Sequence, residues 1–383
     1  MKKRKKTMRL RVIISFLIAL FIIAFSIGEF INYHQSKNKV NKNKTTADSK
    51  KPLEEVKPSA STNVPGVNQI KDEKVEVVLS SAGDCTIGTD PKFNISSSLP
   101  TIVRNNNNDY SYLFKNVAPI FKEDDITIVN LETTFTNATE KADKQFTFKA
   151  PPEFAQSLNL GDIEGVNISN NHIHDFLDKG FKDTISTLQQ YKVNYFGEGN
   201  KWVTEVKGVK FGFLGYQGWS ANKTLFNAMK KDIEELKAQN CVVVINFHWG
   251  IEREYNPNND QKQIAHFAID NGADLIIGHH PHVIQGIEKY KDKYICYSLG
   301  NFCFGGNSNP PDKDTFVFQG KFSFTNKSLT NCAIRVVPFS VSSVNYKNDY
   351  CPTPLKGDAK TKLLEKLNKI SFNLGFKVDE EFK

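Results

Sequence analysis

Residues 242–304 contain two apolar runs that each lead directly into polar residues, VVVINFHWGIEREY at 242–255 and ADLIIGHHPHVIQGIEKY at 273–290, followed by YICYSLGNF at 294–302. A short run of Val, Ile and Leu bounded by turn residues is typical of a buried parallel strand, so we expect strands at 242–246 and 275–277. Open α/β sheets place their sites at the carboxyl ends of such strands. Four of the eight histidines lie at these ends, which indicates a metal or catalytic site. These four are His248, His279, His280 and His282.

Three further apolar runs toward the N-terminus are also followed by side chains that suit metal binding or proton transfer. They are residues 75–79 followed by Asp84, 126–130 followed by Glu132, and 165–169 followed by Asn171 and His172. Segments with helical spacing of apolar residues separate several of these runs. Strands that alternate with helices predict an α/β fold. In such a fold, polar clusters that follow different strands converge if their sheets lie side by side.

The remaining pattern predicts further helices and strands around this framework. Helices are expected at 112–121, from 151 onward, and at 178–191, 222–239, 261–271 and 358–372. Strands are expected at 144–149 and 193–196, in the hairpins 203–206 with 209–215 and 283–288 with 294–298, and in the antiparallel pair 315–324 with 331–338. His266 falls within one of the expected helices, and we assign it to the surface or to packing rather than to the site.

Composition limits the classes of function that the chain can have. Its 383 residues are 39% hydrophobic, which is enough for a buried core. The formal charge of +8 comes from the N-terminal region, where five of the first six residues are Lys or Arg, so we do not expect nucleic-acid binding. None of the six cysteines forms a CxxC pair, which excludes a zinc ribbon or a thioredoxin motif. A bridge between Cys332 and Cys351 stays open.

The N-terminal region divides into three segments. Residues 1–11 are strongly basic, residues 12–31 are mainly apolar, and residues 32–73 are rich in Lys, Asn, Ser, Thr and Pro. An apolar run of this length can span a bilayer as a helix, and the preceding positive charges predict a cytoplasmic N-terminus. We therefore expect a single-pass anchor in the cell membrane, a disordered tether and an extracellular C-terminal domain. A cleaved signal peptide is the alternative interpretation.

The polar residues at the strand ends are a mixture of carboxylates, an amide and imidazoles. Carboxylates supply charge and can bridge two cations, whereas neutral imidazoles supply nitrogen ligands. This mixture suits zinc, manganese or iron better than calcium or magnesium, so we expect one or two divalent transition-metal ions. A two-metal site holds a phosphoryl group and activates a water molecule, and an imidazole that is not a ligand can protonate the leaving group.

The order of these motifs resembles that of the calcineurin-like metallophosphoesterase superfamily, and the sequence around them is similar to the CapA branch, the poly-gamma-glutamate capsule synthesis proteins. The resemblance spans roughly residues 74–337. It lies in GDCTIG (83–88), NLETTFT (130–136), FKAPPEFAQSL (148–158), GVNISNNHIHDFLDKG (165–180), NFHWGIEREY (246–255), GHHPHVIQGIE (278–288) and YSLGNFCF (297–304). It implies a four-layer αββα sandwich over residues 74–345, followed by a C-terminal extension at 346–383 that carries a helix.

The matching motifs also imply a set of metal ligands. One metal position would be served by Asn171, His248 and His280. The other would be served by Asp84 and His282, and Glu132 would bridge the two positions.

Four more residues acquire roles through the resemblance or through their place beside its motifs. His172, next to Asn171, would be the general acid. Asp175 follows closely and would fix the loop or orient His172. Glu252 and Asn301 lie in motifs typical of the family and would complete the substrate pocket.

The chain departs from the superfamily pattern in its first two motifs. The superfamily usually has Asp-x-His in the first motif, but here Asp84 is followed by Cys85 and Thr86. The usual second Asp is replaced by Glu132, so one metal position lacks a nitrogen ligand. Cys85 would point away from Asp84 in an extended segment, and we therefore do not assign it as a ligand.

Two kinds of function are consistent with this sequence. The first is a metal-dependent hydrolase, tethered to the membrane, that acts on a phosphoester or a related bond of a capsule polymer or its carrier. The second is a non-catalytic component of the capsule machinery that binds an anionic poly-glutamate chain or the polymer synthase subunits. The metal-ligand residues favour the enzyme, whereas the lost Asp-x-His favours the binding component. A secreted general phosphatase unrelated to capsule is a weaker third interpretation.

Overall fold

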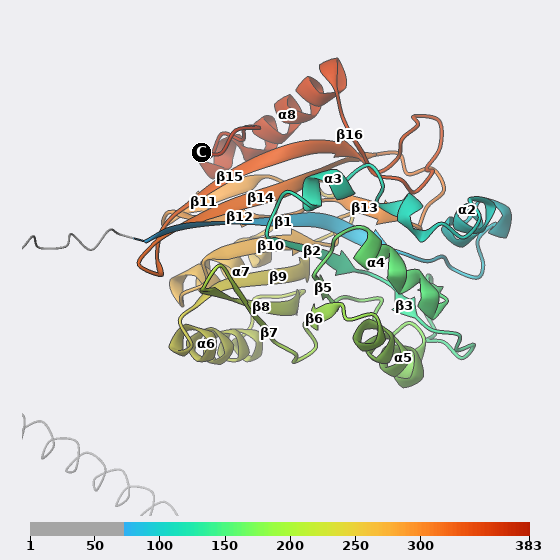
Figure 1. Ribbon diagram of the computed structural model, residues 1–383, viewed down its shortest axis with the longest axis horizontal. Coiled ribbons are helices and arrows are strands. Elements are labelled where there is room, and N and C mark those ends of the chain that lie inside the picture. The colour runs from blue at the N-terminus through green and yellow to red at the C-terminus, as the bar shows by residue number, and fades with distance from the viewer. Residues whose placement is uncertain (1–72) are drawn as a thin grey trace, which may run out of the picture. The chain divides into compact units, whose positions relative to one another are not determined.

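The computed structural model describes residues 73–383, which are built around two β-sheets with helices between the strands (Figure 1). The predicted α/β class is confirmed. The expected basic segment and membrane anchor, and all but the last residue of the expected tether, lie outside the described residues. Within residues 73–383, no helix has the length and apolar character needed to cross a membrane.

The first sheet has eight strands in the order β16-β15-β14-β1-β2-β5-β6, and β13 pairs with β1 outside this path. β1, β2, β5, β6 and β13 run parallel to one another, whereas β14 to β16 add an antiparallel flank. The strands are β1 (Lys74–Thr86), β2 (Ile126–Leu131), β5 (Gly165–Asn167), β6 (Asn194–Phe196), β13 (Asn301–Phe304), β14 (Asp314–Thr325), β15 (Ser328–Ser340) and β16 (Thr353–Pro354). A separate parallel pair joins β3 (Thr134–Phe135) to β4 (Lys149–Ala150).

The second sheet has six strands in the order β11-β12-β10-β9-β8-β7. Its four central strands are parallel, and each edge strand belongs to a hairpin. The strands are β7 (Trp202–Val206), β8 (Val209–Gly218), β9 (Cys241–Trp249), β10 (Leu275–His279), β11 (Ile287–Tyr290) and β12 (Lys293–Cys296). Lys207 and Gly208 both have positive φ in the β7–β8 turn, the conformation that a two-residue hairpin loop requires.

The two sheets pack face to face, and helices cover both outer faces. Val77, Leu79 and Ile128 of the first sheet share one core with Phe211 and Val244 of the second. The helices are α2 (Leu99–Asn105), α3 (Ala118–Phe121), α4 (Gln156–Leu160), α5 (Leu177–Gln190), α6 (Lys223–Ala238), α7 (Asn259–Asp270) and α8 (Gly357–Ser371), with short 3-10 turns at Ile95–Ser97, Tyr110–Leu113, Pro152–Ala155 and Phe372–Leu374. Helices α2 to α5 pack outside the first sheet, and α6 and α7 pack outside the second (Figure 1).

The C-terminal helix α8 contacts β15 of the first sheet and β11 of the second, so it closes one side of the sandwich (Figure 1). Its Leu363 and Leu367 are buried in the core between the sheets. The expected extension at 346–383 therefore packs against the domain that precedes it.

Alternation along the strands decides which side chains face the other sheet. In β9, Val242 and Val244 enter the core between the sheets, whereas Val243 and Ile245 pack against the outer helices. Because side chains alternate with a period of two, His248 continues the inward row of Val242 and Val244. The same rule in β2 places Glu132 two residues beyond Asn130 on the inward side. The polar ends of both sheets therefore face one another at one end of the sandwich.

An irregularity in β1 is needed to bring Asp84 to this inward side. The pairing of β1 with β2 shifts register between Ala82 and Asp84. Ala82 and Cys85 both pack in the outer core under the helices, so the shift turns Asp84 inward. Gly83 lies at the shift, and a Cβ there would lie 2.0 Å from the carbonyl oxygen of Gly300. The prediction that Cys85 points away from Asp84 is confirmed.

Most predicted elements form, although their ends move. The predicted strand at 75–79 runs on as β1 through Thr86, so the polar segment that we expected in a turn belongs partly to a strand. The strand expected at 283–288 begins only at Ile287, and its hairpin turns at Lys291 and Asp292. The buried face predicted for 222–239 is confirmed by Met229, Ile233 and Leu236.

Two predictions of secondary structure are wrong. The helix expected at 112–121 is a 3-10 turn followed by the short helix α3, because Pro119 has no N–H to donate to a preceding helical turn and is tolerated only in the first turn of a helix, where it lies in α3. The strand expected at 144–149 is irregular until Lys149. Its backbone donates to side chains instead of to a neighbouring strand, since Thr147 bonds to Asp90 and Phe148 bonds to Asp175.

All six cysteines are free thiols. Cys332 lies on β15 opposite Phe322, whereas Cys351 precedes β16, which pairs with the far end of β15 at Ser340. Eight residues of strand separate Cys332 from Ser340, a span of about 26 Å at ~3.3 Å per residue. The open alternative of a Cys332–Cys351 bridge is therefore excluded, because a disulfide requires α-carbons within roughly 7 Å.

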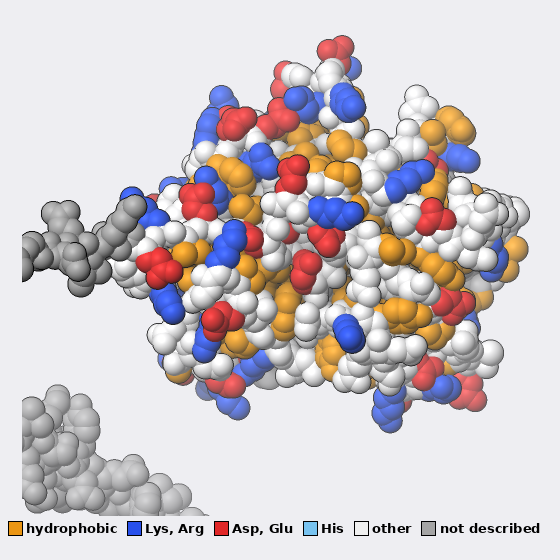
Figure 2. All heavy atoms as spheres, viewed as in Figure 1, with side chains coloured by type: hydrophobic (Ala, Val, Ile, Leu, Met, Phe, Trp, Pro, Cys, Tyr) orange, Lys and Arg blue, Asp and Glu red, His pale blue; other side chains and the backbone are white. Residues whose placement is uncertain are grey.

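The surface of the described domain carries charges of both signs. Figure 2 shows acidic and basic side chains interspersed over one face, with apolar side chains between them and no large patch of a single sign. This distribution differs from the concentrated positive charge at the N-terminus of the sequence.

Replacing Gly278 by Ala should destabilise the domain by about 1–3 kcal/mol, the usual range for overpacking a core. A Cβ at Gly278 in β10 would lie 2.0 Å from the backbone oxygen of Tyr297, so the backbone must shift. Thermal unfolding followed by circular dichroism measures the change. Gly320→Ala in β14 is the matched control, because its Cβ would come no closer than 3.3 Å to a side-chain atom of Phe322. An unchanged melting temperature for Gly278→Ala would contradict the prediction.

Candidate metal centre

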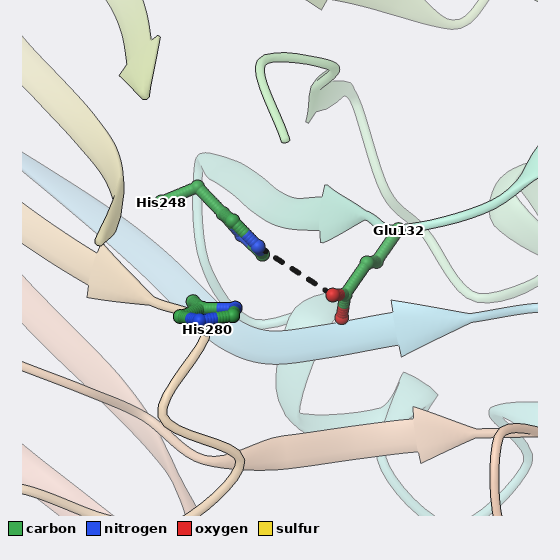
Figure 3. Close-up of side chains that lie close together, drawn as sticks. All are labelled: Glu132, His248 and His280. Atoms are coloured by element: carbon green, nitrogen blue, oxygen red, sulfur yellow. Dashed lines mark ion pairs between the residues drawn. The ribbon is translucent and has the colours of Figure 1, made fainter. Parts of the chain in front are cut away.

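The predicted ligand residues converge at one end of the sandwich, although they come from distant parts of the chain. Asp84 lies near the end of β1, Glu132 directly follows β2, and His248 lies near the end of β9. His280 and His282 follow β10, with Asn171 in the turn after β5. Figure 3 shows the side chains of Glu132, His248 and His280 directed toward one another.

Glu132 is the central residue of this cluster. Its carboxylate is fully buried, and neither oxygen has a hydrogen-bond partner among the described residues. Its Oε1 lies 3.5 Å from Nε2 of His248, 3.9 Å from Nε2 of His282 and 4.0 Å from Nε2 of His172. A buried carboxylate without hydrogen bonds is strongly unfavourable. A cation held between this carboxylate and the imidazoles would remove that penalty, so the residues fit a metal ion.

The described residues contain three sets of side chains whose potential ligand atoms lie within 4.8 Å of one another. The sets are Glu132 with His248 and His280, Asp84 with Glu132 and His282, and Glu252 with His280 and His282. Glu132 belongs to the first two sets, which is the arrangement that a bridging carboxylate requires. Asn171 adds an amide oxygen at 2.8 Å from Nε2 of His248. The six predicted ligands are thus together, and their role as ligands stays a prediction.

A row of buried asparagines orients the cluster. The amide nitrogen of Asn130 donates to Oδ1 of Asp84 at 2.8 Å and lies 3.2 Å from Nδ1 of His248. The amide nitrogen of Asn167 donates in turn to Oδ1 of Asn130 at 3.0 Å. Residues that hydrogen-bond to metal ligands in this way fix the orientation and the protonation state of those ligands. The sequence analysis did not assign Asn130 or Asn167, although each is a polar residue at the end of a buried strand.

The imidazoles of the cluster differ in protonation. Burial, with a contribution from His282, lowers the pKa of His280 to about 3, and burial also lowers the pKa of His248. Both rings are therefore neutral near pH 7, the form that binds a metal. Burial opposes a charge on His282, but Glu132 and Asp84 together raise the pKa of His282 to about 10. A metal that binds between these two carboxylates must displace that proton.

His172 forms a separate unit beside the cluster. Its Nδ1 lies 2.7 Å from Oδ2 of Asp175, and its Nε2 faces Glu132. Asp175 also accepts hydrogen bonds from the backbone N–H of Phe148 and from Nζ of Lys144. Burial lowers the pKa of His172 more than Asp175 raises it, so Nε2 is a proton acceptor at neutral pH in the free protein. Asp175 therefore has the contacts of a residue that orients an imidazole.

Two of the clustered imidazoles, in the loop after β10, are carried by residues with unusual backbone angles. His280 has φ of 96° and His282 has φ of 58°, values that are uncommon for residues other than glycine. The backbone N–H of His280 donates to Oδ2 of Asp84 at 3.2 Å, and the N–H of Arg253 donates to the oxygen of Pro281 at 2.8 Å. Strained residues held by surrounding contacts are typical of functional sites.

The first motif lacks its usual histidine, and a histidine from another strand lies beside Asp84 instead. Thr86 stands at that position, and its buried hydroxyl has no hydrogen-bond partner in the described part of the chain. His279, which is also fully buried, places Nδ1 at 3.6 Å from Oδ1 of Asp84. Its Nε2 lies 3.0 Å from the amide oxygen of Asn246, so the ring is held in the layer behind the ligands. Asp84 therefore has a histidine nearby, from a different strand than the motif expects.

The two predicted pocket residues lie beside the cluster. Asn301 places its amide oxygen 2.9 Å from Nδ1 of His282 and donates to the backbone oxygen of the same residue, so it orients His282. Glu252 is exposed, and its carboxylate belongs to a potential ligand set. Both residues line a pocket of about 150 Å³ that opens next to His172.

Two histidines lie outside the cluster, and two residues that the sequence analysis did not assign lie beside it. His266 is paired with Glu288 and stacked on Tyr290, as its assignment to surface or packing predicted. His174 is bound to Glu198 and does not enter the cluster. The sequence analysis missed Trp219 and Arg253. The ring of Trp219 lies edge-on to His280 at 4.7 Å, and Arg253 lines the pocket without an ion pair among the described residues. In the sequence, Trp219 is recognisable only as an aromatic residue and Arg253 only as a cation, each in a segment between predicted elements.

Comparison with known proteins finds relatives that are named for the synthesis of a capsule, of PGA or of polyglutamine. Residues 78–306 match the family described as "Bacterial capsule synthesis protein PGA_cap". The "PGA biosynthesis protein CapA" of Bacillus subtilis (strain 168) is 30% identical over 293 residues, which cover 70% of this chain and 74% of the relative. The "Capsule biosynthesis protein CapA" of Bacillus anthracis is 32% identical over 220 residues, 50% of this chain and 54% of the relative. A "Probable polyglutamine synthesis accessory protein" of Mycobacterium tuberculosis (strain ATCC 25618 / H37Rv) is 26% identical over 208 residues, 46% of this chain and 55% of the relative.

Glu132→Gln should raise the melting temperature of the metal-free protein at pH 7, by the equivalent of about 1–3 kcal/mol for an unsatisfied buried group. Burial and the charge of Asp84 raise the pKa of Glu132 well above its usual value. The folded state therefore binds this proton more tightly than the unfolded state does, and stability falls as the pH rises through the unfolded value of about 4.3. The advantage of Glu132→Gln should accordingly shrink toward pH 4.

Scanning calorimetry of the metal-free protein from pH 4 to pH 8 measures this difference. Glu198→Gln is the matched control, because Glu198 already accepts hydrogen bonds from Ser169 and Gln217 and should gain nothing. A lower melting temperature for metal-free Glu132→Gln at pH 7 would show that the carboxylate is satisfied within the protein.

Proposed function

The chain belongs to the PGA_cap family of bacterial capsule synthesis proteins, the CapA family, and from this membership we propose that it takes part in the synthesis or export of a poly-gamma-glutamate-like capsule polymer. The Bacillus relatives carry names for PGA or capsule biosynthesis, and the mycobacterial relative is named as an accessory protein of synthesis. Such a component has the anionic polymer or its carrier as a ligand, and polymer synthase subunits as further partners.

The proposed activity is metal-dependent hydrolysis of a phosphoester or a related bond in the polymer or its carrier. The observation that carries it is the buried carboxylate of Glu132, which faces three imidazoles without a hydrogen bond. One or two divalent ions of zinc, manganese or iron would supply positive charge and Lewis acidity there. The layers of helix, sheet, sheet and helix agree with the metallophosphoesterase-like sandwich that the resemblance implies.

The protein's own groups divide the remaining work. Asp84, Glu132, Asn171, His248, His280 and His282 would form the ligand set, and Asn130 holds Asp84 and His248 in place. His172 would carry a proton at Nε2 on the side that faces the cluster. It can act as the general acid if an anionic substrate favours its protonated form, and Asp175 keeps the ring in position throughout.

Arg253 and Glu252 line the pocket through which a substrate would approach His172. A guanidinium group binds phosphate or carboxylate in two-point geometry, so Arg253 is suited to an anionic group of the substrate. Asn301 and Glu252, the two predicted pocket residues, would act from the same wall.

A second candidate function is a non-catalytic component that binds the polymer or the synthase. The observation that favours it is Thr86 at the position of the usual histidine ligand, with a hydroxyl that has no partner. The absence of that ligand would weaken one metal position. In either case the domain would act outside the cell, held at the membrane by the apolar segment at 12–31 and the tether at 32–73.

The purified full-length protein should contain one or two equivalents of a transition metal, and both Asp84→Ala and His280→Ala should lose most of it. Each substitution removes a ligand from a potential metal set, and loss of one ligand leaves the others too few to hold the ion. Elemental analysis by mass spectrometry measures the content before and after reconstitution with manganese or zinc. His266→Ala, a histidine bound to Glu288 away from the cluster, should keep the wild-type metal content. A metal-free wild type after reconstitution would favour the non-catalytic component.

His172→Ala should lower turnover of an alkyl phosphodiester, whose alkoxide leaving group requires a proton, by about 10²–10⁴-fold, the range for loss of a positioned proton donor, and should retain its metal. Asp175→Asn should also lower turnover, because the ring of His172 loses the carboxylate that orients it. Steady-state rates, measured together with metal content, separate these effects from loss of the ion. His174→Ala, which changes a neighbouring histidine outside the cluster, is the control. Full activity in His172→Ala would exclude the proton-transfer role.

A further inference from the structure

A second pocket continues from the one beside the metal centre. The two pockets share Phe146, Gly306 and Asn307 in their walls. The second pocket has a volume of about 320 Å³, at the lower end of the range for small-molecule sites. No residue assigned to the metal centre lines it. A substrate that reaches the metal centre through the first pocket can therefore extend into the second.

The walls of the second pocket are held by buried contacts. Asn348 is almost fully buried, and its side-chain amide donates to the backbone oxygens of Phe304 and Asn307. The hydroxyl of Tyr350 donates to the backbone oxygen of Ser97 at 2.6 Å on the opposite side. A Cβ at Gly305 would lie 1.9 Å from the backbone oxygen of Gly88, so only glycine permits this approach of the two walls. The pocket is therefore formed before any ligand arrives.

A row of aromatic rings runs from His172 into this pocket. The ring of Phe148 lies 4.6 Å from His172, Phe146 stacks on Phe148 at 6.4 Å, and Phe93 follows at 5.9 Å from Phe146. Phe146 is 43% exposed and forms part of both pockets. An exposed aromatic face between polar walls is a platform for a ligand that has one apolar face and polar edges.

The polar groups of the pocket are uncharged, and several have no protein partner. The hydroxyl of Thr89 has no hydrogen bond among the described residues, but it is buried behind the pocket wall, so a ligand does not reach it. Asn94 and Asn307 each use the amide oxygen to accept a hydrogen bond, from Ser96 and Asn309 respectively, and their amide nitrogens donate to no protein group among the described residues. None of the residues that line the pocket is charged. The amide nitrogens of Asn94 and Asn307 are therefore available to hydrogen-bond a neutral ligand.

We propose that this pocket is a subsite for a neutral sugar unit of the substrate, next to the group that reacts at the metal centre. A sugar ring places its C–H face on Phe146 and its hydroxyls toward the amide groups of Asn94 and Asn307. A glutamate unit is a poorer match, because its carboxylate would have no cation in this pocket. The assignment rests on the proposed function in that it treats both pockets as one substrate surface, but the pocket itself needs no metal.

The test uses the full-length protein and N-acetylglucosamine as the probe, with binding followed by saturation-transfer NMR and by calorimetry. Phe146→Ala should weaken binding about threefold to tenfold, the effect of losing one aromatic contact. Asn94→Ala should weaken it by a similar factor through one lost hydrogen bond, because the amide nitrogen of Asn94 donates to no protein group among the described residues. Phe372→Ala changes an 81% exposed ring in the C-terminal 3-10 turn and should bind as the wild type does.

The measurements are made on metal-free and on metal-loaded protein, so that failure of the metal centre and failure of the sugar subsite are separate results. With metal present, tighter binding of N-acetylglucosamine 1-phosphate than of the neutral sugar would identify a sugar phosphate as the ligand. Equal binding of the two would identify a glycan without phosphate, and both results support the subsite. Absence of sugar binding, sugar binding that both substitutions leave unchanged, or Phe146-dependent binding of a γ-glutamyl oligomer in place of the sugar would each overturn the proposal.

Discussion

Two sheets packed face to face can bury only every second side chain of a strand between them, and the rest of this structure depends on that constraint. Along β9 the rule sends Val242 and Val244 into the shared core and then His248 to the same side. The strand β1 departs from the rule where its register shifts before Asp84, and this shift brings Asp84 to the inward side. Polar residues that are separated by up to 200 positions in the chain thereby meet where the apolar core ends.

The meeting of these residues sets up an electrostatic conflict inside the domain. Glu132 has no hydrogen bond within residues 73–383, His280 and His282 have strained backbones, and the charges of Glu132 and Asp84 raise the pKa of the partly buried His282. The first two features each reduce the stability of the protein. A divalent cation between the carboxylates and the neutral imidazoles would balance these charges.

The two pockets beside the cluster differ in charge, and this difference bears on the kind of substrate that they fit. The charged residues Glu252 and Arg253 stand at the pocket beside His172, whereas the neighbouring pocket has aromatic and neutral polar walls. Two chemically different compartments joined at Phe146 fit a ligand with an ionised part and a neutral part. For a member of the capsule synthesis family, such a ligand would be the junction between an anionic polymer and the neutral group that carries it.

The sequence by itself determined the α/β class, the family and the six residues, predicted as ligands, that cluster in the structure, because apolar runs followed by His, Asp, Glu or Asn are local patterns. It also determined that Cys85 turns away from Asp84. Only the tertiary structure decided that the segment at 144–149 is irregular, since its backbone bonds to Asp90 and Asp175 from elsewhere in the chain. The roles of Asn130 and Trp219 and the second pocket were likewise decided by contacts between distant segments, which no local pattern of residues records.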